Sequence, residues 1–255
     1  MPRFVIRNIP YAIVSPNVTT TGLTVTNNAA HSGMATLTLE MWIYYVDDSA
    51  IVGMLMENTN AGILTAYQLD YQPGVGFRFY CRIGGVDRSV IGTTTRLQKS
   101  TWNFIQAVYT GSAMQFFVNG AQLAETTTGL SGSIGASSNV LRIGWYTNNT
   151  ASYALNGVIY CPRVYRASCT LAEHKDRYYN NITSTALQTG LVLDLAMTEG
   201  SGTSLADSSP TGATTTINTN ASWTATNTPF KARTAVSGRV AASGRVAASG
   251  RTAIS

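Results

Sequence analysis

Apolar and polar residues alternate along several runs of the chain. The clearest runs cover residues 37–43, 77–83 and 102–108. In the first run the apolar positions are Leu37, Leu39, Met41 and Ile43, and the polar face carries Thr38, Glu40, Trp42 and, one step further, Tyr44. A period of two residues is that of a β-strand with one buried face, so each run predicts a strand.

Short turn sequences separate these runs. Gly84-Gly85, Gly111-Ser112 and Asn119-Gly120 each stand between two strand-like segments. Asn-Gly is the strongest short hairpin signal because both residues accept a positive φ. Strands at this spacing, with no long helical pattern between them, predict an all-β fold, an antiparallel β-sandwich.

One short helix is expected within this strand pattern, near residues 170–179. Thr170 is followed three residues later by Glu173, which is the spacing of a capping box. We therefore expect Thr170 to cap a helix that runs to about Tyr179.

The end of the chain repeats a six-residue unit, R-V-A-A-S-G with small variations. Because six is an even number, an extended chain would carry Arg233, Arg239, Arg245 and Arg251 on one side, roughly 20 Å apart. The repeat contains no large side chain that could build a core, so it cannot fold alone. We expect an extended arm that a partner orders.

Charge separates this arm from the rest of the chain. The sequence has 17 Lys and Arg and 12 Asp and Glu, a net charge of +5. Five basic residues and no acid follow residue 230, which leaves 17 − 5 = 12 basic and 12 acidic residues before it. We divide the chain into an N-terminal arm (1–10), a sandwich domain (11–230) and a basic C-terminal arm (231–255).

The neutral sandwich domain gives no indication of nucleic-acid binding, which requires a basic face. The arm has three interpretations: a passive linker, a ligand for nucleic-acid phosphates, or a docking segment. We favour docking, because its Val and Thr can add a strand to a partner sheet while its arginines pair with acids there.

Cysteine and histidine offer little chemistry. Cys81, Cys161 and Cys169 fit no zinc spacing, and we expect them to be buried thiols. His31 and His174 are the only histidines. The first residues do not read as a signal peptide, because Pro10 interrupts the apolar run, and no apolar stretch is long enough to insert into a membrane.

Five segments in order resemble the laminin-G-like, concanavalin-A-like family of jelly-roll domains. They are L-T-L-E-M-W-I-Y (37–44), W-N-F-I-Q-A-V-Y (102–109), F-F-V-N-G (116–120), L-R-I-G-W (141–145) and L-N-G-V-I-Y-C-P-R-V-Y through the 170–174 helix start. A further piece, E-G-S-G with D-S-S-P-T-G after it, often precedes the first strand in that family but comes last here. The resemblance implies a domain that binds rather than catalyses, with edge strands supplied in an unusual order.

Some proteins of this fold cleave glucans with two carboxylates on one strand, in an E-x-D-x-x-E pattern. Here the corresponding strand offers Glu40 alone, and Asp47 and Asp48 lie beyond its end. No G-x-S-x-G motif supports a serine triad either. We expect no enzymatic activity and no required cofactor.

Calcium is the one ion worth considering, since some laminin-G-like domains bind it at a rim. Oxygen ligands are available from one group with Asp47, Asp48, Asn58 and Asn60, and from another with Asp207, Ser208 and Ser209. The alternative is that the aspartates end a strand and cap a turn.

A glycan site requires an aromatic platform beside amide or carboxylate groups. Two sets of residues meet this requirement: Trp145, Tyr146, Asn148 and Asn149 after one strand, and Trp42 and Tyr44 on the polar face of another. The alternative is that Trp42 belongs to the core and that the 146–152 loop is merely polar.

Together these inferences favour a non-enzymatic structural and adhesion module. We expect its jelly-roll head to be anchored by the arm in a virion, such as a bacteriophage capsid or tail assembled in the host cytoplasm, as one of several copies. Host glycans are the second expected partner. The alternatives are a free-standing extracellular lectin and a glucanase-like hydrolase.

Overall fold

The computed structural model describes residues 11–19, 21–46, 52–60, 63–93, 97–147, 151–181 and 183–225. The two arms, with the four repeated arginines, lie outside the described residues. So do Asp47, Asp48, Asn148 and Asn149, and the predictions that rest on them stay predictions.

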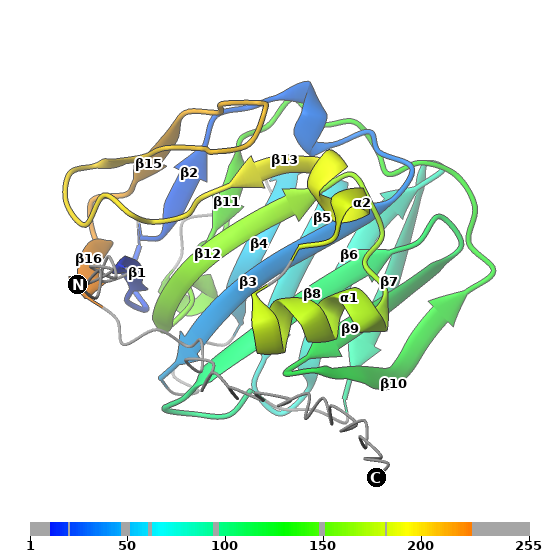
Figure 1. Ribbon diagram of the computed structural model, residues 1–255, viewed down its shortest axis with the longest axis horizontal. Coiled ribbons are helices and arrows are strands. Elements are labelled where there is room, and N and C mark those ends of the chain that lie inside the picture. The colour runs from blue at the N-terminus through cyan, green and yellow to red at the C-terminus, as the bar shows by residue number, and fades with distance from the viewer. Residues whose placement is uncertain are drawn as a thin grey trace, which may run out of the picture.

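Two antiparallel sheets of eight strands each pack face to face (Figure 1). Sheet A has the order β10-β9-β8-β3-β12-β1-β16, with β13 also paired to β12. Its strands are β1 (Tyr11–Ser15), β3 (Leu37–Tyr45), β8 (Trp102–Tyr109), β9 (Ala113–Val118), β10 (Ala121–Thr128), β12 (Gly157–Tyr165), β13 (Leu191–Asp194) and β16 (Ser222–Ala225). The predicted all-β sandwich is confirmed.

Sheet B lies behind sheet A in the view of Figure 1 and has the order β14-β15-β2-β11-β4-β5-β6-β7. Its strands are β2 (Leu23–Val25), β4 (Gly53–Asn60), β5 (Ile63–Gln72), β6 (Gly76–Ile83), β7 (Val86–Gly92), β11 (Leu141–Ile143), β14 (Ser204–Leu205) and β15 (Thr215–Ile217). The short helical segments are η1 (Ala29–His31), η2 (Ala151–Tyr153), α1 (Leu171–Lys175), the π-helix η3 (Asp176–Asn180) and α2 (Thr185–Thr189).

The period-two pattern decides which residues meet between the sheets. The apolar positions of 37–43 are all fully buried, as predicted. They share the interior with Phe77 and Phe79 of sheet B, whose rings lie 5.8 and 6.2 Å from the ring of Phe116 in sheet A. The three cysteines are buried free thiols, also as predicted.

The predicted hairpins join neighbouring strands. Gly84 and Gly85 both have positive φ in the turn between β6 and β7, and Asn119 and Gly120 do so between β9 and β10. These dihedrals are the ones that such two-residue turns require.

The last described segments complete both sheets. β13 pairs with β12, β14 and β15 extend sheet B beyond β2, and β16 pairs with β1 at the edge of sheet A. The family-like segment that comes last in the sequence contains β14, the edge strand of sheet B.

The predicted helix forms as α1 and continues directly into η3. Thr170 and Glu173 form a complete capping box, in which the side chain of each accepts a hydrogen bond from the backbone N–H of the other. A second helix, α2, was not predicted; it has only five residues, and Ser184 caps it. Both helices lie on the outer face of sheet A (Figure 1) and cover a small second core that contains Val108, Phe117, Tyr165, Cys169, Leu187 and Leu191.

None of the helices in the described part of the chain has the length and apolar character needed to cross a bilayer.

Candidate functional site

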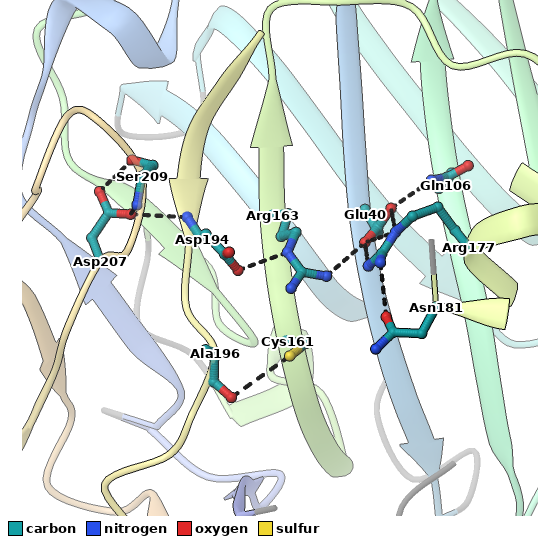
Figure 2. A network of polar contacts seen from close by, with 10 residues as sticks. All are labelled: Glu40, Gln106, Cys161, Arg163, Arg177, Asn181, Asp194, Ala196, Asp207 and Ser209. Atoms are coloured by element: carbon teal, nitrogen blue, oxygen red, sulfur yellow. Dashed lines mark hydrogen bonds and ion pairs between the residues drawn. The ribbon is translucent and has the colours of Figure 1, made fainter. Parts of the chain in front are cut away.

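Each sheet has a polar row of registered residues on its outer face, and the two rows have different surroundings. On sheet A the row runs Gln106, Glu40, Arg163, Asp194 across β8, β3, β12 and β13 (Figure 2). Arg177 reaches this row from η3, and its side chain and that of Glu40 are 2% and 1% exposed. This row is sealed beneath the helix.

The polar atoms around Glu40 are fully engaged. Its carboxylate accepts hydrogen bonds from Gln106 Nε2 at 2.6 Å, from Arg163 Nη1 at 3.2 Å and from Arg177 Nε at 3.2 Å, and it also contacts Arg177 Nη2. Burial alone would raise the pKa of Glu40, but Arg177 and then Arg163 outweigh it and hold the pKa at about 2. Glu40 is therefore ionised and structural.

His174 completes this network as a neutral ring. Its Nε2 accepts the backbone N–H of Gly120 at 2.9 Å, so Nδ1 carries the proton and donates to Gln106 Oε1, also at 2.9 Å. Burial lowers the pKa of His174 to about 4. With every polar atom of the ring engaged, His174 has no capacity left for a ligand.

Asp207 lies at the far end of the same network and organises a loop. Its carboxylate accepts the backbone N–H groups of Asp194, Ser209 and Ala213, each at 2.9 Å, and the hydroxyls of Ser209 and Thr211. Burial opposes ionisation, but these hydrogen bonds lower the pKa of Asp207. Both carboxylate oxygens of Asp207 accept hydrogen bonds from the loop. This arrangement is the one expected if Asp207 caps a turn and does not bind calcium.

Among the described residues, no three or more His, Cys, Asp and Glu side chains gather as a metal site. Asn58, the other described candidate ligand in the interior of a strand, is 1% exposed, whereas Asn60 at the end of β4 is exposed. The first candidate group also needs Asp47 and Asp48, which lie outside the described residues, so that calcium site stays a prediction.

Trp42 and Tyr44 also lie on the outer face of sheet A. Trp42 is 3% exposed and packs against Phe104 at 4.9 Å and Tyr178 at 5.7 Å, two rings that also stack on each other. Tyr44 is half-buried against Trp102. Because Trp42 is buried in this way, it fits the alternative that it belongs to a core layer, and it does not share a site with Trp145.

The outer face of sheet B carries a row that crosses all eight strands. The registered residues are Ser204, Thr216, Thr24, Arg142, Glu57, Gln68, Tyr80 and Ser89. Asp70 and Arg78 stand opposite each other one step further along β5 and β6. Helices α1 and α2 lie on the other sheet, and the short η2 packs against β4 here, so the row is a candidate surface for a ligand.

Three ion pairs link neighbouring strands on this face. Arg142 Nη1 lies 3.3 Å from Glu57 Oε1, Arg78 Nε lies 2.6 Å from Asp70 Oδ1, and Arg82 Nη1 lies 2.8 Å from Asp87 Oδ1. The Glu57 and Asp70 side chains are 0% exposed, whereas their guanidinium partners are 13% and 18% exposed. The carboxylates thus lie at the base of the face and the arginines reach its surface.

Glu57 is the least compensated of these acids. Burial raises its pKa to about 7, although it accepts hydrogen bonds from the Thr59 hydroxyl at 2.7 Å, from Arg142 and from the backbone N–H of Thr147. Burial also raises the pKa of Asp70, against the opposing effect of Arg78 and Gln68. A buried carboxyl group that titrates near neutral pH is typical of functional surfaces.

Aromatic side chains from the segment after β11 lie over this charged row. Trp145 stacks on Arg142 at 5.3 Å, and its indole N–H donates to Leu23 O at 2.9 Å. Tyr146 and Tyr153 pack together at 5.5 Å, and burial followed by the nearby Glu57, Tyr153 and Asp70 charges raises the pKa of Tyr146. Trp145 thus packs on Arg142 and Tyr146 on Tyr153, and the platform expected from the sequence stays a prediction.

Gly144 allows this segment to leave β11. Its φ is +84°, and an added Cβ would lie 2.6 Å from Ile159 Cδ1. Any side chain here would be forced into the core, so only glycine lets the chain turn directly onto the outer face of sheet B.

Sequence reasoning missed the four charged residues at the centre of this face: Glu57, Asp70, Arg78 and Arg142. Arg78 does lie on the polar side of the predicted 77–83 strand, which was a usable signal. Its pairing with Asp70 depends on the register between β5 and β6, which alternation within one strand does not give.

Solved structures with similar folds were found in several organisms. The chain matches a protein from Bacteroides ovatus ATCC 8483, provisionally described as carbohydrate binding, with a TM-score of 0.63 and 16% identity over 88% of this chain and 62% of that one. It matches a heptameric SAP-like pentraxin from Limulus polyphemus with a TM-score of 0.55 and 11% identity, over 84% of this chain and 97% of that one. Identities this low establish the fold alone. The chain also spans less than two thirds of the Bacteroides protein.

No curated protein matches the sequence at the significance required. The family described as the concanavalin A-like lectin/glucanases superfamily matches residues 17–173, more than half of the chain. This match agrees with the resemblance drawn from the sequence motifs and with the two-sheet architecture. The chain belongs to the concanavalin A-like lectin/glucanases superfamily.

Proposed function

We propose that this domain binds glycans through the outer face of sheet B and does not hydrolyse them. One observation carries the proposal: Trp145, Tyr146 and Tyr153 lie over two neighbouring ion pairs whose guanidinium groups reach the surface. The superfamily contains lectins, and the Bacteroides protein of similar fold is described as carbohydrate binding. These descriptions support the proposal.

The chemistry of the face suits sugars. The apolar face of a sugar ring packs on an aromatic side chain, and its hydroxyls require fixed donors and acceptors at the edge. Arg142 and Arg78 supply fixed donors, because Glu57 and Asp70 hold them in place. Gln68 and Tyr80 lie in the same row and add an amide and a phenol.

Hydrolysis is the second candidate function, and one observation favours it. Glu57 has a pKa near 7, as a general acid requires, and Asp70 lies diagonally across β4 and β5 from it. A glycosidase, however, needs both carboxyl groups to reach the scissile bond. Here each side chain is 0% exposed and bound by an arginine, so binding fits the geometry better.

The test compares two tryptophans on an array of immobilised glycans. Trp145→Ala removes the platform, whereas Trp223→Ala removes a half-buried tryptophan from β16 at the edge of sheet A. The two are matched, because Trp223 also donates its indole N–H to a backbone carbonyl, Gly202 O at 2.8 Å. We expect the first variant to lose at least about tenfold in affinity and the second to stay within about twofold.

Equal losses from both variants, or a folded domain that binds nothing on the array, would contradict the proposal. A reducing-sugar assay on the glycans that bind separates the two candidates. Release of reducing ends, abolished by Glu57→Gln, would support hydrolysis instead.

The anchoring role of the C-terminal arm remains part of the proposal and depends on the sequence alone. The regular Arg233, Arg239, Arg245 and Arg251 suit docking onto an acidic surface of a larger assembly such as a virion, with several copies of the domain side by side. Deleting residues 231–255 should abolish co-sedimentation with the particle while leaving glycan binding intact. Unchanged co-sedimentation would refute the anchoring role of the arm, whereas a full chain that does not co-sediment would favour the free-standing extracellular lectin.

A further inference from the structure

We infer that Glu57 sets the charge selectivity of the glycan-binding face: while ionised it restricts the face to neutral glycans, and once neutral it admits acidic ones. This inference rests on the proposed function and names the class of ligand.

The first step is the charge balance of the face. Its described charged residues form three pairs, Arg142 with Glu57, Arg78 with Asp70 and Arg82 with Asp87. Within the described residues each guanidinium on this face has its own carboxylate, so the face carries no net charge when all are ionised. A uronic-acid or sulfate group would then bring a negative charge to a face without a spare positive one.

The second step is that the pairs differ in strength. Arg78 bonds to Asp70 through Nε at 2.6 Å, donates to Gln72 Oε1 at 2.5 Å and lies over the ring of Tyr80. Arg142 makes a 3.3 Å contact with Glu57, a 3.5 Å contact with Thr59 O and a stacking contact with the Trp145 ring. Its Nε–H is buried and has no partner among the described residues. Arg142 is therefore the more weakly held arginine of the two.

The third step is the place of this pair. Arg142 lies directly against Trp145, so any charge released there is beside the aromatic platform. A carboxylate on a sugar ring stacked near Trp145 would meet the exposed part of the Arg142 side chain, which is 13% exposed. Charge-assisted contacts of this kind are among the strongest polar interactions in proteins.

The fourth step is what surrounds Glu57. Arg142 faces it from β11, Thr59 from its own strand, and Gln68 from β5. The backbone N–H of Thr147 and the Tyr146 ring face it from the segment after β11, and the Asp70–Arg78 pair lies on the diagonal. Arg142 is thus the single cation directly paired with Glu57 in the described part of the chain.

Protonation of Glu57 would therefore have the same effect as replacing it with a neutral residue. Burial places the titration of Glu57 close to neutral pH, so acidification converts the carboxylate into a neutral acid that no longer compensates Arg142. The face then changes from neutral to positive next to Trp145.

The experiment uses the full chain and an array of matched glycan pairs, in which each neutral hexose oligomer is accompanied by the corresponding uronic-acid oligomer. Binding is measured at pH 8.5 and pH 5.5. For the wild type we expect neutral probes to bind equally at both values, and acidic probes to gain at least about tenfold at pH 5.5. Glu57→Gln should bind acidic probes at both pH values.

Asp87→Asn is the matched control, since it removes the carboxylate of the exposed Arg82 pair on the same face. It should leave the ratio of acidic to neutral binding unchanged. Thermal melts of each variant confirm that it is folded.

Wild-type preference for acidic probes at pH 8.5, or a ratio that Glu57→Gln does not change, would overturn the inference while leaving the glycan-binding function in place. A folded chain that binds neither class would contradict the proposed function itself.

Discussion

Glu40 and Glu57 are two buried glutamates on outward-facing positions of different sheets. The pKa of each departs from its ordinary value, and the two shifts have opposite directions. The pKa of Glu40 falls from 4.5 to about 2, and that of Glu57 rises from 4.5 to about 7. Burial acts on both in the same direction, so burial does not explain the contrast.

The number of cations around each carboxylate explains the opposite pKa shifts of Glu40 and Glu57. Glu40 contacts two guanidinium groups and the Gln106 amide, whereas Glu57 has one arginine at 3.3 Å. A saturated network holds a helix in place and offers nothing to a ligand. An incompletely compensated network leaves a weakly held arginine that still reaches the surface, which is where we place the function.

The largest expected effect comes from removing a cation from the saturated side. Arg177→Met should destabilise the protein by about 3–5 kcal/mol, because Glu40 would lose its main partner while remaining buried. Urea denaturation at pH 7 measures the loss. A loss of unfolding free energy below about 1 kcal/mol would mean that Arg163 alone compensates Glu40. The number of cations would then not explain the difference between Glu40 and Glu57.

The next effect is a dependence of stability on pH that comes from Glu57. A folded-state pKa above the unfolded one favours folding below about pH 4.5, and this contribution is lost as pH rises through about 7. Relative to Glu57→Gln, the wild type should lose up to about 3 kcal/mol of unfolding free energy between pH 4.5 and 8.5. Parallel pH profiles for the two proteins would contradict the raised pKa.

A smaller effect is expected at the helix that seals sheet A. Thr170→Ala removes the side chain that caps α1 and should cost about 1 kcal/mol. Hydrogen exchange should then accelerate in residues 171–180, with β4 to β7 unaffected. Faster exchange in sheet B would show that the two outer faces are not independent.

The smallest effect belongs to the exposed pair of sheet B. Arg82 and Asp87 are 40% and 57% exposed, so Arg82→Gln should change stability by about 0.5 kcal/mol or less. A loss comparable with that of Arg177→Met would imply that exposure does not separate the two classes of ion pair.

Much of the fold could be predicted from the sequence because alternation within a strand is a local property. A few neighbouring residues are enough to predict the strands at 37–43 and 77–83, the Asn119-Gly120 turn and the Thr170 cap. The five-residue α2 lacks such a signal, because it is too short to show a helical period.

The candidate site could be predicted only in part. Trp145 and Tyr146 were identifiable as aromatic residues after a strand. Glu57 and Arg142 are 85 positions apart, and their contact depends on β11 pairing with β4. Whether an outward-facing aromatic stays open also depends on the tertiary structure: Trp42 is covered by Tyr178, a residue of η3.

The pairing of β1 with β16 and of β2 with β15 has a consequence for synthesis on the ribosome. β1 and β2 also pair with β12 and β11, but their edges that face β16 and β15 stay unpaired until about two hundred further residues have been synthesised. For that time the nascent domain presents bare sheet edges, the kind of surface at which chains associate wrongly. A chaperone that shields edges, or neighbouring copies kept apart during translation, would matter more to the yield of this protein than to its final stability.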